Sequence, residues 1–187
     1  MKHMDEAVKL WTADELLDAG DRMERCELWD GLPVVREPSG GPAEIVGGRI
    51  YGPLWNHNEK RRLGWVTMSS QGFLVARDPD RVLAPDVAFT SHERLPSVPR
   101  RSFFPCAPDF AVEVRSPADS WTSVAAKCGI WISHGCAVVW GVDPEERQVT
   151  VFRPGVVPQM VPEGRHADAA PALPGFMLPV ASLFRDL

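Results

Sequence analysis

Apolar and acidic residues alternate in two short segments of the chain, and this period of two predicts two β-strands. Residues 85–89 read Pro-Asp-Val-Ala-Phe, and residues 108–115 read Pro-Asp-Phe-Ala-Val-Glu-Val-Arg. Because alternate side chains of a strand point to opposite faces, the apolar residues are expected to face the core. Asp86 and Glu113 are then expected on the other face, which the pattern predicts to be exposed. The expected core residues are Val87, Phe89, Phe110, Val112 and Val114.

The pattern of the remaining chain predicts further helices and strands. A first helix opens at a capping box, in which Thr12 is followed by Glu15. Two more helices are expected over 43–63, with a break at Gly52-Pro53, and from the cap Ser116-Pro117 to about His134. Strands are expected as a hairpin over 26–35, two short strands over 65–76, and single strands over 138–142 and 148–152.

This order of elements predicts the α/β (α+β) class: a sandwich with a central mixed β-sheet flanked by helices. A chain of 187 residues is long enough to bury one core of this kind. A single domain is expected over residues 10–187, and residues 1–9 are expected to be an N-terminal tail, for which an origin in an expression vector is left open. The sequence contains no apolar run of about 18 residues, which is the length that a membrane span requires.

Charge and cysteine content narrow the classes of function. The net charge of −5 does not favour non-specific binding of nucleic acid, which usually relies on a surplus of Lys and Arg. Two local basic clusters, at 60–62 and at the arginines 94, 100 and 101, are open to interpretation as phosphate-binding or simply solvated surface. The 4 cysteines form no CxxC pair, which disfavours a zinc site and fits reduced thiols in a cytoplasmic protein.

Asp86 and Glu113 are the first candidates for chemistry. Two carboxylates from neighbouring strands can hold a divalent cation between hard oxygen ligands. Each also has an ordinary structural interpretation. An Asp after a Pro often serves only in a turn, and a carboxylate flanked by valines is either exposed, bound to a metal, or ion-paired, for example with Lys127. Asp109 is interpreted as a strand-entrance residue rather than as a metal ligand.

Several phrases along the chain occur in the order found in one family. They are Glu-Leu-Trp-Asp-Gly at 27–31, Pro-Asp-Val-Ala-Phe at 85–89, the segment 108–117, Trp-Gly-Val-Asp-Pro-Glu at 140–145, Val-Thr-Val-Phe-Arg-Pro at 149–154 and Leu-Pro-Gly-Phe at 173–176. From about Leu10 to the C-terminus, the chain resembles the Uma2 (DUF820) family of cytoplasmic bacterial endonucleases. The resemblance implies the restriction-endonuclease-like PD-(D/E)xK fold.

The resemblance also implies a set of site residues. Asp86 and Glu113 would be catalytic metal ligands, with the backbone of Val114 as a further metal donor. Lys127 would orient or activate the attacking water. The secondary candidates are Glu27, Glu44, Asp109 and Arg115, the last because it shares a strand face with Glu113 and carries a cation that can contact phosphate.

The combined prediction is a Mg²⁺-dependent endonuclease that hydrolyses the phosphodiester bonds of DNA, with Mn²⁺ as a substitute for Mg²⁺. One alternative is a nuclease-fold binding module that has lost turnover and acts through a protein or nucleic-acid partner; another is an enzyme acting on RNA. A homodimer is expected, because related nucleases often use one active site per strand. Its candidate interface consists of Trp131, Trp140 and the proline-rich C-terminal segment.

Overall fold

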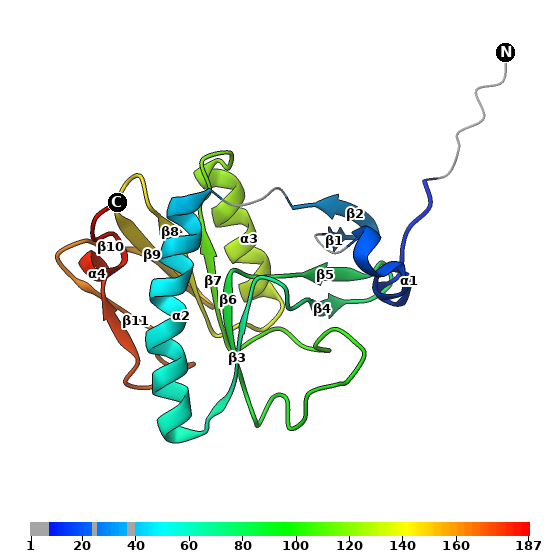
Figure 1. The fold of residues 1–187 in the computed structure, drawn as a ribbon, viewed down its shortest axis with the longest axis horizontal. Coiled ribbons are helices and arrows are strands. Elements are labelled where there is room, and N and C mark those ends of the chain that lie inside the picture. The colour runs from blue at the N-terminus through cyan, green and yellow to red at the C-terminus, as the bar shows by residue number, and fades with distance from the viewer. Residues whose placement is uncertain (1–7, 24–25, 37–39) are drawn as a thin grey trace, which may run out of the picture.

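The computed structural model describes residues 8–23, 26–36 and 40–187, and Figure 1 shows its ribbon. Its helices are α1 (Ala13–Ala19), α2 (Gly41–Arg61), α3 (Trp121–Ser133) and α4 (Val180–Leu183), with a 3₁₀ turn at Gly20–Met23. Its strands are β1 (Cys26–Trp29), β2 (Leu32–Val35), β3 (Gly64–Met68), β4 (Phe73–Ala76), β5 (Arg81–Leu83), β6 (Val87–Ser91), β7 (Phe110–Val114), β8 (Val138–Asp143), β9 (Gln148–Arg153), β10 (Val156–Pro162), β11 (His166–Asp168) and β12 (Met177–Pro179). The expected N-terminal tail falls outside the described residues, except for Val8 and Lys9.

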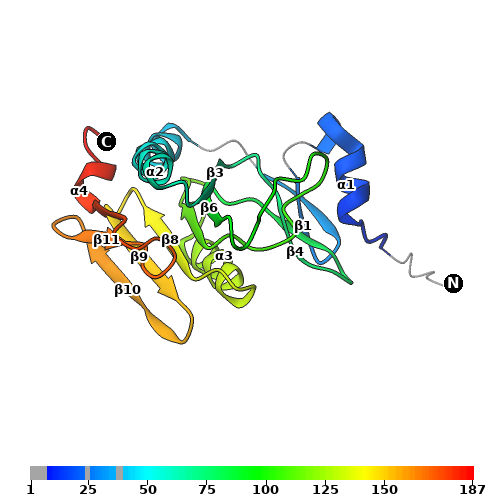
Figure 2. The same ribbon diagram turned by 90° about the horizontal axis from the view of Figure 1, so that it is seen from below.

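A six-stranded sheet, in the order β10-β9-β8-β7-β6-β3, forms the centre of the fold. β7 and β8 pair in parallel, whereas the other neighbours pair antiparallel, so the sheet is mixed. α2 packs on one face of this sheet and α3 on the other, as the view in Figure 2 shows. The predicted sandwich with a central mixed sheet and flanking helices is therefore confirmed.

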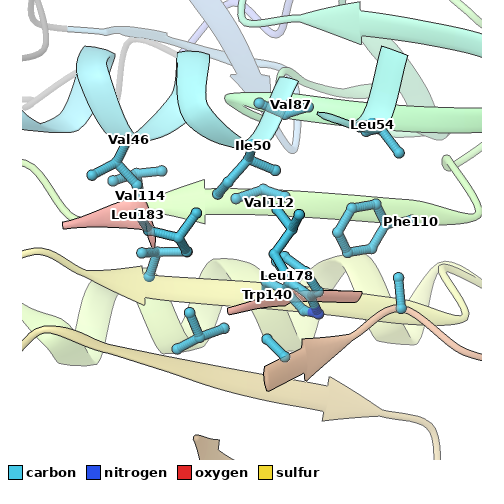
Figure 3. Close-up of a cluster of buried hydrophobic side chains, with 14 of the residues drawn as sticks. Val46, Ile50, Leu54, Val87, Phe110, Val112, Val114, Trp140, Leu178 and Leu183 are labelled. Atoms are coloured by element: carbon cyan, nitrogen blue, oxygen red, sulfur yellow. The ribbon is translucent and has the colours of Figure 1, made fainter. Parts of the chain in front are cut away.

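The core lies between α2 and the central sheet. Val46, Ile50 and Leu54 follow one another at four-residue spacing and are fully buried. Figure 3 shows them pointing from α2 towards Phe110 and Val112 of β7. Burying each such aliphatic side chain contributes about 1.5–3 kcal/mol, so this stripe holds α2 firmly over the sheet.

The opposite face of β7 is buried as well. Ala111 contributes to a second apolar cluster with Val124, Cys128 and Trp131 of α3. The alternation along β7 was thus predicted correctly, but the expectation of an exposed face around Glu113 was wrong. The parallel β7–β8 pair places the crossover helix α3 over that face, because a connection between parallel strands must cross the sheet.

α2 runs without interruption past Gly52-Pro53, so the break expected there is absent. Pro53 lies on the exposed side of the helix, while its neighbour Leu54 is fully buried. An interior Pro costs about 3 kcal/mol in an isolated helix, and the burial of the apolar stripe of α2 offsets that cost.

α3 begins later than the sequence predicted. Its cap is Ser120, whose side chain accepts a hydrogen bond from the backbone N–H of Ser123. Ser116 belongs to a separate turn, because its hydroxyl donates to a carboxylate oxygen of Asp119 at 2.6 Å. The pair Ser116-Pro117 was therefore wrongly predicted as the helix start, since its own local hydrogen bonds compete with helix formation.

A second sheet of four strands, in the order β2-β1-β5-β4, lies beside the central one. Its hairpin β1–β2 turns at Asp30 and Gly31, whose φ angles of 53° and 78° are those of the turn predicted for this pair. The two short strands expected over 65–76 exist as β3 and β4 but join different sheets. Gly64 at the start of β3 permits close approach, because a Cβ there would lie 2.1 Å from the carbonyl oxygen of Thr90 on β6.

Candidate active site

Five charged side chains from separate elements meet at the end of β7. They come from β1, the residue after β2, the residue before β6, β7 and α3, and we call them the charged cluster: Glu27, Arg36, Asp86, Glu113 and Lys127. Antiparallel pairing places the beginning of β6 beside the end of β7. The turn from β5 into β6 then brings the second sheet to the same point. Asp86, Glu113 and Lys127 were expected to converge, and the structure brings them together.

Asp86 is anchored by the backbone of β7. Its Oδ2 accepts a hydrogen bond from the N–H of Val114 at 2.7 Å, and its own N–H donates to the carbonyl of Val112 at 3.0 Å. Its Oδ1 faces Arg36, whose Nη2 lies 3.0 Å away. Asp86 is therefore held by tertiary contacts rather than by a local turn. The proposed donor residue Val114 lies at the site, and the metal-binding role of its backbone stays a prediction.

Glu113 is buried, with 5% of its surface exposed. Its Oε1 accepts a hydrogen bond from the indole Nε1 of Trp131 at 2.6 Å and lies 3.2 Å from Nζ of Lys127. Both partners come from α3, one helical turn apart. The ion pair that the sequence left open as an alternative for Glu113 is thus present, and the same contacts orient its carboxylate.

Lys127 connects two carboxylates. Its Nζ lies 2.8 Å from Oε1 of Glu27 and donates to the carbonyl of Ala84 at 3.1 Å, in addition to the contact with Glu113. Lys127 stands in the middle of α3, which runs from Trp121 to Ser133. Its side chain is 13% exposed, so it is not the solvated helix residue that its type suggests.

Glu27, a secondary candidate, lies at the centre of the charged cluster. It is 4% exposed. Its Oε1 accepts the backbone N–H of Ala84 at 2.9 Å, and its Oε2 accepts the indole N–H of Trp29 at 3.0 Å. These bonds join β1 to the β5–β6 turn, so Glu27 ties the second sheet to the site.

With all three carboxylates ionised, the charged cluster holds three negative and two positive charges, which leaves one negative charge in excess. Burial raises the pKa of Glu113 to about 7; the carboxylates of Asp86 and Glu27 add to that effect, and Lys127 opposes it. Burial alone would lower the pKa of Lys127, but the carboxylates of Glu113 and Glu27 outweigh it and raise the pKa. Glu113 is therefore the member that carries a proton most readily, while Lys127 stays an ammonium at neutral pH.

Two secondary candidates have partners elsewhere. Asp109 accepts the backbone N–H of Ser91 at 2.7 Å and pairs with Nε of Arg94 at 2.9 Å, as suits the strand-entrance residue that was expected. Arg115 pairs with Asp143 at 3.0 Å and with Glu145 at 2.9 Å. The prediction that Arg115 shares an exposed face with Glu113 was wrong, because β7 ends at Val114, Arg115 pairs with the last residue of β8, and Glu113 faces α3.

Glu44 lies near Asp86 at the beginning of α2. The two carboxylates line one small cavity of about 10 Å³, together with Ala43, Gly47, Met68 and Ser69. Such a volume corresponds to about one water molecule. The basic residues 60–62 stand at the far end of α2, about 25 Å from Glu44 at about 1.5 Å per residue. Their phosphate-binding interpretation therefore has no support from proximity to this site.

Two residues of the site, Trp131 and Arg36, were not predicted from the sequence. Trp131 was assigned to a dimer interface, yet it is fully buried and bonds to Glu113. Its place four residues after Lys127 puts both on one helix face, which is a signal that the sequence contained. Arg36 was absent from the predicted site residues. Its position depends on the path of the chain after the β1–β2 hairpin, which no local pattern reveals.

The oxygen donors of the charged cluster fit a hard divalent cation. Asp86 directly precedes β6 and Glu113 stands on the neighbouring β7, and with all three carboxylates ionised the cluster carries an excess negative charge that such an ion would neutralise. Within the described ranges, no group of three or more His, Cys, Asp or Glu side chains is arranged as a metal site. Two carboxylates with one backbone oxygen, the predicted set, would satisfy an ion such as Mg²⁺ that keeps several waters.

The family model of Uma2, described as "Putative restriction endonuclease", matches residues 13–181. The chain belongs to the Uma2 family. The fold of this Uma2 chain is similar to a crystal structure described as "a putative nuclease belonging to DUF820" from Anabaena variabilis ATCC 29413, with a TM-score of 0.80 and 20% sequence identity over 92% of this chain and 97% of that chain. No curated protein matches the sequence. The family and fold predicted from the ordered phrases are thereby confirmed.

Among residues 8–23, 26–36 and 40–187, no helix combines the length and the apolar character that crossing a membrane requires.

Proposed function

We propose that this Uma2 protein is a Mg²⁺-dependent endonuclease that hydrolyses phosphodiester bonds in DNA, with Mn²⁺ able to replace Mg²⁺. One observation carries the proposal: Asp86 and Glu113 come together from neighbouring strands, and Lys127 lies 3.2 Å from Glu113. Membership of a family of restriction-endonuclease type supports it. The choice of DNA over RNA rests on that family description, since the carboxylates alone do not distinguish the two.

In this proposal, Asp86, Glu113 and the backbone of Val114 hold the metal. When bound, Mg²⁺ would supply Lewis acidity towards the phosphate and acidify a water. Trp131 fixes the Glu113 carboxylate through its indole N–H. Lys127 contributes a positive charge and orients water; its raised pKa argues against a role as general base, because an ammonium has no free lone pair.

A second candidate is a binding module that keeps the fold without turnover. The contact that favours it is the ion pair between Arg36 and Asp86, in which a side-chain cation occupies an oxygen that a metal would need. Such a module would act through a protein or nucleic-acid partner. The two candidates differ in one measurable respect, because only the enzyme cleaves its nucleic acid when Mg²⁺ or Mn²⁺ is added.

Plasmid nicking with Mg²⁺ or Mn²⁺ tests the proposal. We expect the wild type to nick supercoiled DNA, and Asp86→Asn, Glu113→Gln and Lys127→Met each to lower the rate by about 100-fold or more. Asp109→Asn is the matched control, because it removes a carboxylate that pairs with Arg94 outside the charged cluster. Parallel reactions on single-stranded RNA decide the substrate. Wild-type protein that cleaves neither nucleic acid with either metal supports the module.

We also propose that the protein works as a cytoplasmic homodimer. Its cysteines are free thiols, which suits a reducing compartment. Trp131 and Trp140 cannot form the interface that was expected, because both are fully buried. Within the proline-rich C-terminal segment, Val157 and Met160 on the edge strand β10 are 85% and 59% exposed and remain candidates. Sedimentation of wild type and of Val157→Glu measures the oligomeric state: a dimer that the substitution dissociates supports this interface.

A further inference from the structure

We propose that Arg36 competes with the divalent cation for Asp86 and thereby sets the metal affinity of the site. The inference rests on the proposed function, since it assumes that Asp86 is a metal ligand. It assigns a positioning role to a residue that lies outside the predicted set of ligands and catalytic groups.

The contacts of Asp86 leave a cation one oxygen to take. Oδ2 accepts the backbone N–H of Val114 at 2.7 Å, a bond that fixes the carboxylate to β7. Oδ1 lies 3.0 Å from Nη2 of Arg36. A metal that uses Oδ1 must therefore meet the guanidinium at the same atom, and the two positive charges repel each other at contact distance.

Arg36 is placed so that it can give way. Its side chain is 26% exposed, twice the 13% of Lys127, and it follows the edge strand β2. Its other contacts are weak: Nη1 lies 3.3 Å from the carbonyl oxygen of Ser69, and Nε lies 3.7 Å from Oε1 of Glu27. Lys127, by contrast, is only 13% exposed and is held by contacts of 2.8 Å and 3.1 Å to Glu27 and Ala84. Of the two cations of the charged cluster, Arg36 is the displaceable one.

The exchange balances the charge of the site. With Arg36 in contact, three carboxylates face two cations. The divalent ion takes Oδ1, and the guanidinium moves towards solvent. One positive charge of the ion replaces that of Arg36 at Asp86, and the other neutralises the excess negative charge. Removing Arg36 abolishes the competitor, so the free carboxylates should bind the ion more tightly, by about tenfold or more.

The experiment measures binding of Mn²⁺ alone, by isothermal titration calorimetry on the full chain without nucleic acid. We compare the wild type with Arg36→Gln, Arg36→Lys and Arg94→Gln. Arg94→Gln is the matched control, because Arg94 pairs with Asp109 at 2.9 Å and is 30% exposed, much like Arg36 with Asp86. Thermal unfolding in EDTA and in Mn²⁺ follows the same four proteins and reports whether each one folds.

The expected result is a Kd for Mn²⁺ about tenfold or more lower in Arg36→Gln, an intermediate value in Arg36→Lys, and no change in Arg94→Gln. Arg36→Gln should also melt at a lower temperature than wild type in EDTA and recover the difference in Mn²⁺, because the ion replaces the lost charge. Tighter binding by Arg36→Gln supports the inference even if wild type binds no Mn²⁺.

Two results would overturn it in different ways. If wild type binds Mn²⁺ and Arg36→Gln binds it equally or more weakly, the competition is wrong and the proposed metal site stands. If no variant, Arg36→Lys included, binds Mn²⁺ at millimolar concentration, both the competition and the proposed metal-dependent function are wrong. Should Arg36→Gln fail to fold, Arg36→Lys decides, since it keeps the charge but loses the planar fork of donors.

Discussion

Glu113→Gln is expected to make the protein more stable at pH 8 while it removes a proposed metal ligand. The carboxylate is 5% exposed and shares two cations with two other carboxylates. Gln has nearly the same shape, and its carbonyl oxygen can still accept the indole N–H of Trp131. Lys127 keeps its contacts with Glu27 and Ala84. The substitution therefore removes a buried negative charge while keeping an acceptor for the indole N–H of Trp131.

The magnitude follows from the pKa of Glu113, which burial raises from an ordinary 4.5 to about 7. A group whose folded pKa is raised binds its proton more tightly in the folded state, so the stability it contributes is full below pH 4.5 and is lost as the pH rises through about 7. At about 1.4 kcal/mol per pH unit, the loss in wild type amounts to about 3 kcal/mol at pH 8 and less than about 1 kcal/mol at pH 5. Glu113→Gln has no ionisable group at this position, so its free energy of unfolding does not fall in this way as the pH rises.

Urea unfolding in EDTA at pH 5, 6, 7 and 8 measures the difference. We expect the free energy of unfolding of Glu113→Gln to exceed that of wild type by about 2–3 kcal/mol at pH 8, and the gap to close towards pH 5. The control, Asp109→Asn, loses its pair with Arg94 and should gain no stability at pH 8. A gap that is absent at pH 8, or that stays constant with pH, refutes the reasoning that burial of this carboxylate is the cause.

Three further substitutions probe the contacts around the site and the sheet. Lys127→Met leaves Glu27 and Glu113 without their shared cation and should lower the free energy of unfolding by about 3–5 kcal/mol at pH 8, as measured by urea unfolding; a loss below about 1 kcal/mol would show that the pair is not coupled. Trp131→Phe removes the N–H that donates to Glu113 at 2.6 Å, so it should cost about 1–3 kcal/mol and steepen the loss of stability between pH 6 and pH 8; an unchanged pH profile would contradict this. Gly64→Ala places a Cβ 2.1 Å from the carbonyl oxygen of Thr90, forces β3 away from β6 and should cost more than about 2 kcal/mol. Its control, Gly129→Ala on the exposed side of α3, meets no atom within 4 Å and should stabilise the protein by up to about 1 kcal/mol in the same assay.

Local patterns were sufficient for the elements whose cause is local. The capping box at Thr12 and Glu15, the hairpin at Asp30-Gly31 and the alternation along β7 all appear in the structure as predicted. Each depends on residues a few positions apart, and their physical requirements can be read from a short window. The choice of Asp86 and Glu113 depended partly on such patterns and partly on the resemblance to a family.

Tertiary packing decided what the local patterns predicted wrongly. The helix α2 passes through Pro53 because burial of its apolar stripe outweighs a local preference. The strands β3 and β4, adjacent in sequence, belong to two different sheets, because β3 pairs with β6 across the chain whereas β4 forms a hairpin with β5.

The sequence by itself determined the class of fold, the order of its main elements and two of the carboxylates that meet at the site. Only the tertiary structure decided that Glu113 is buried under α3, that Glu27 and Lys127 form an ion pair, and that Arg36 faces Asp86. The physical reason is that periodicity reports which side of an element is apolar, whereas the charge and the burial of a site depend on which other elements cover that side. Those partners lie 50 and 100 positions apart for Arg36–Asp86 and Glu27–Lys127, beyond the reach of any local pattern.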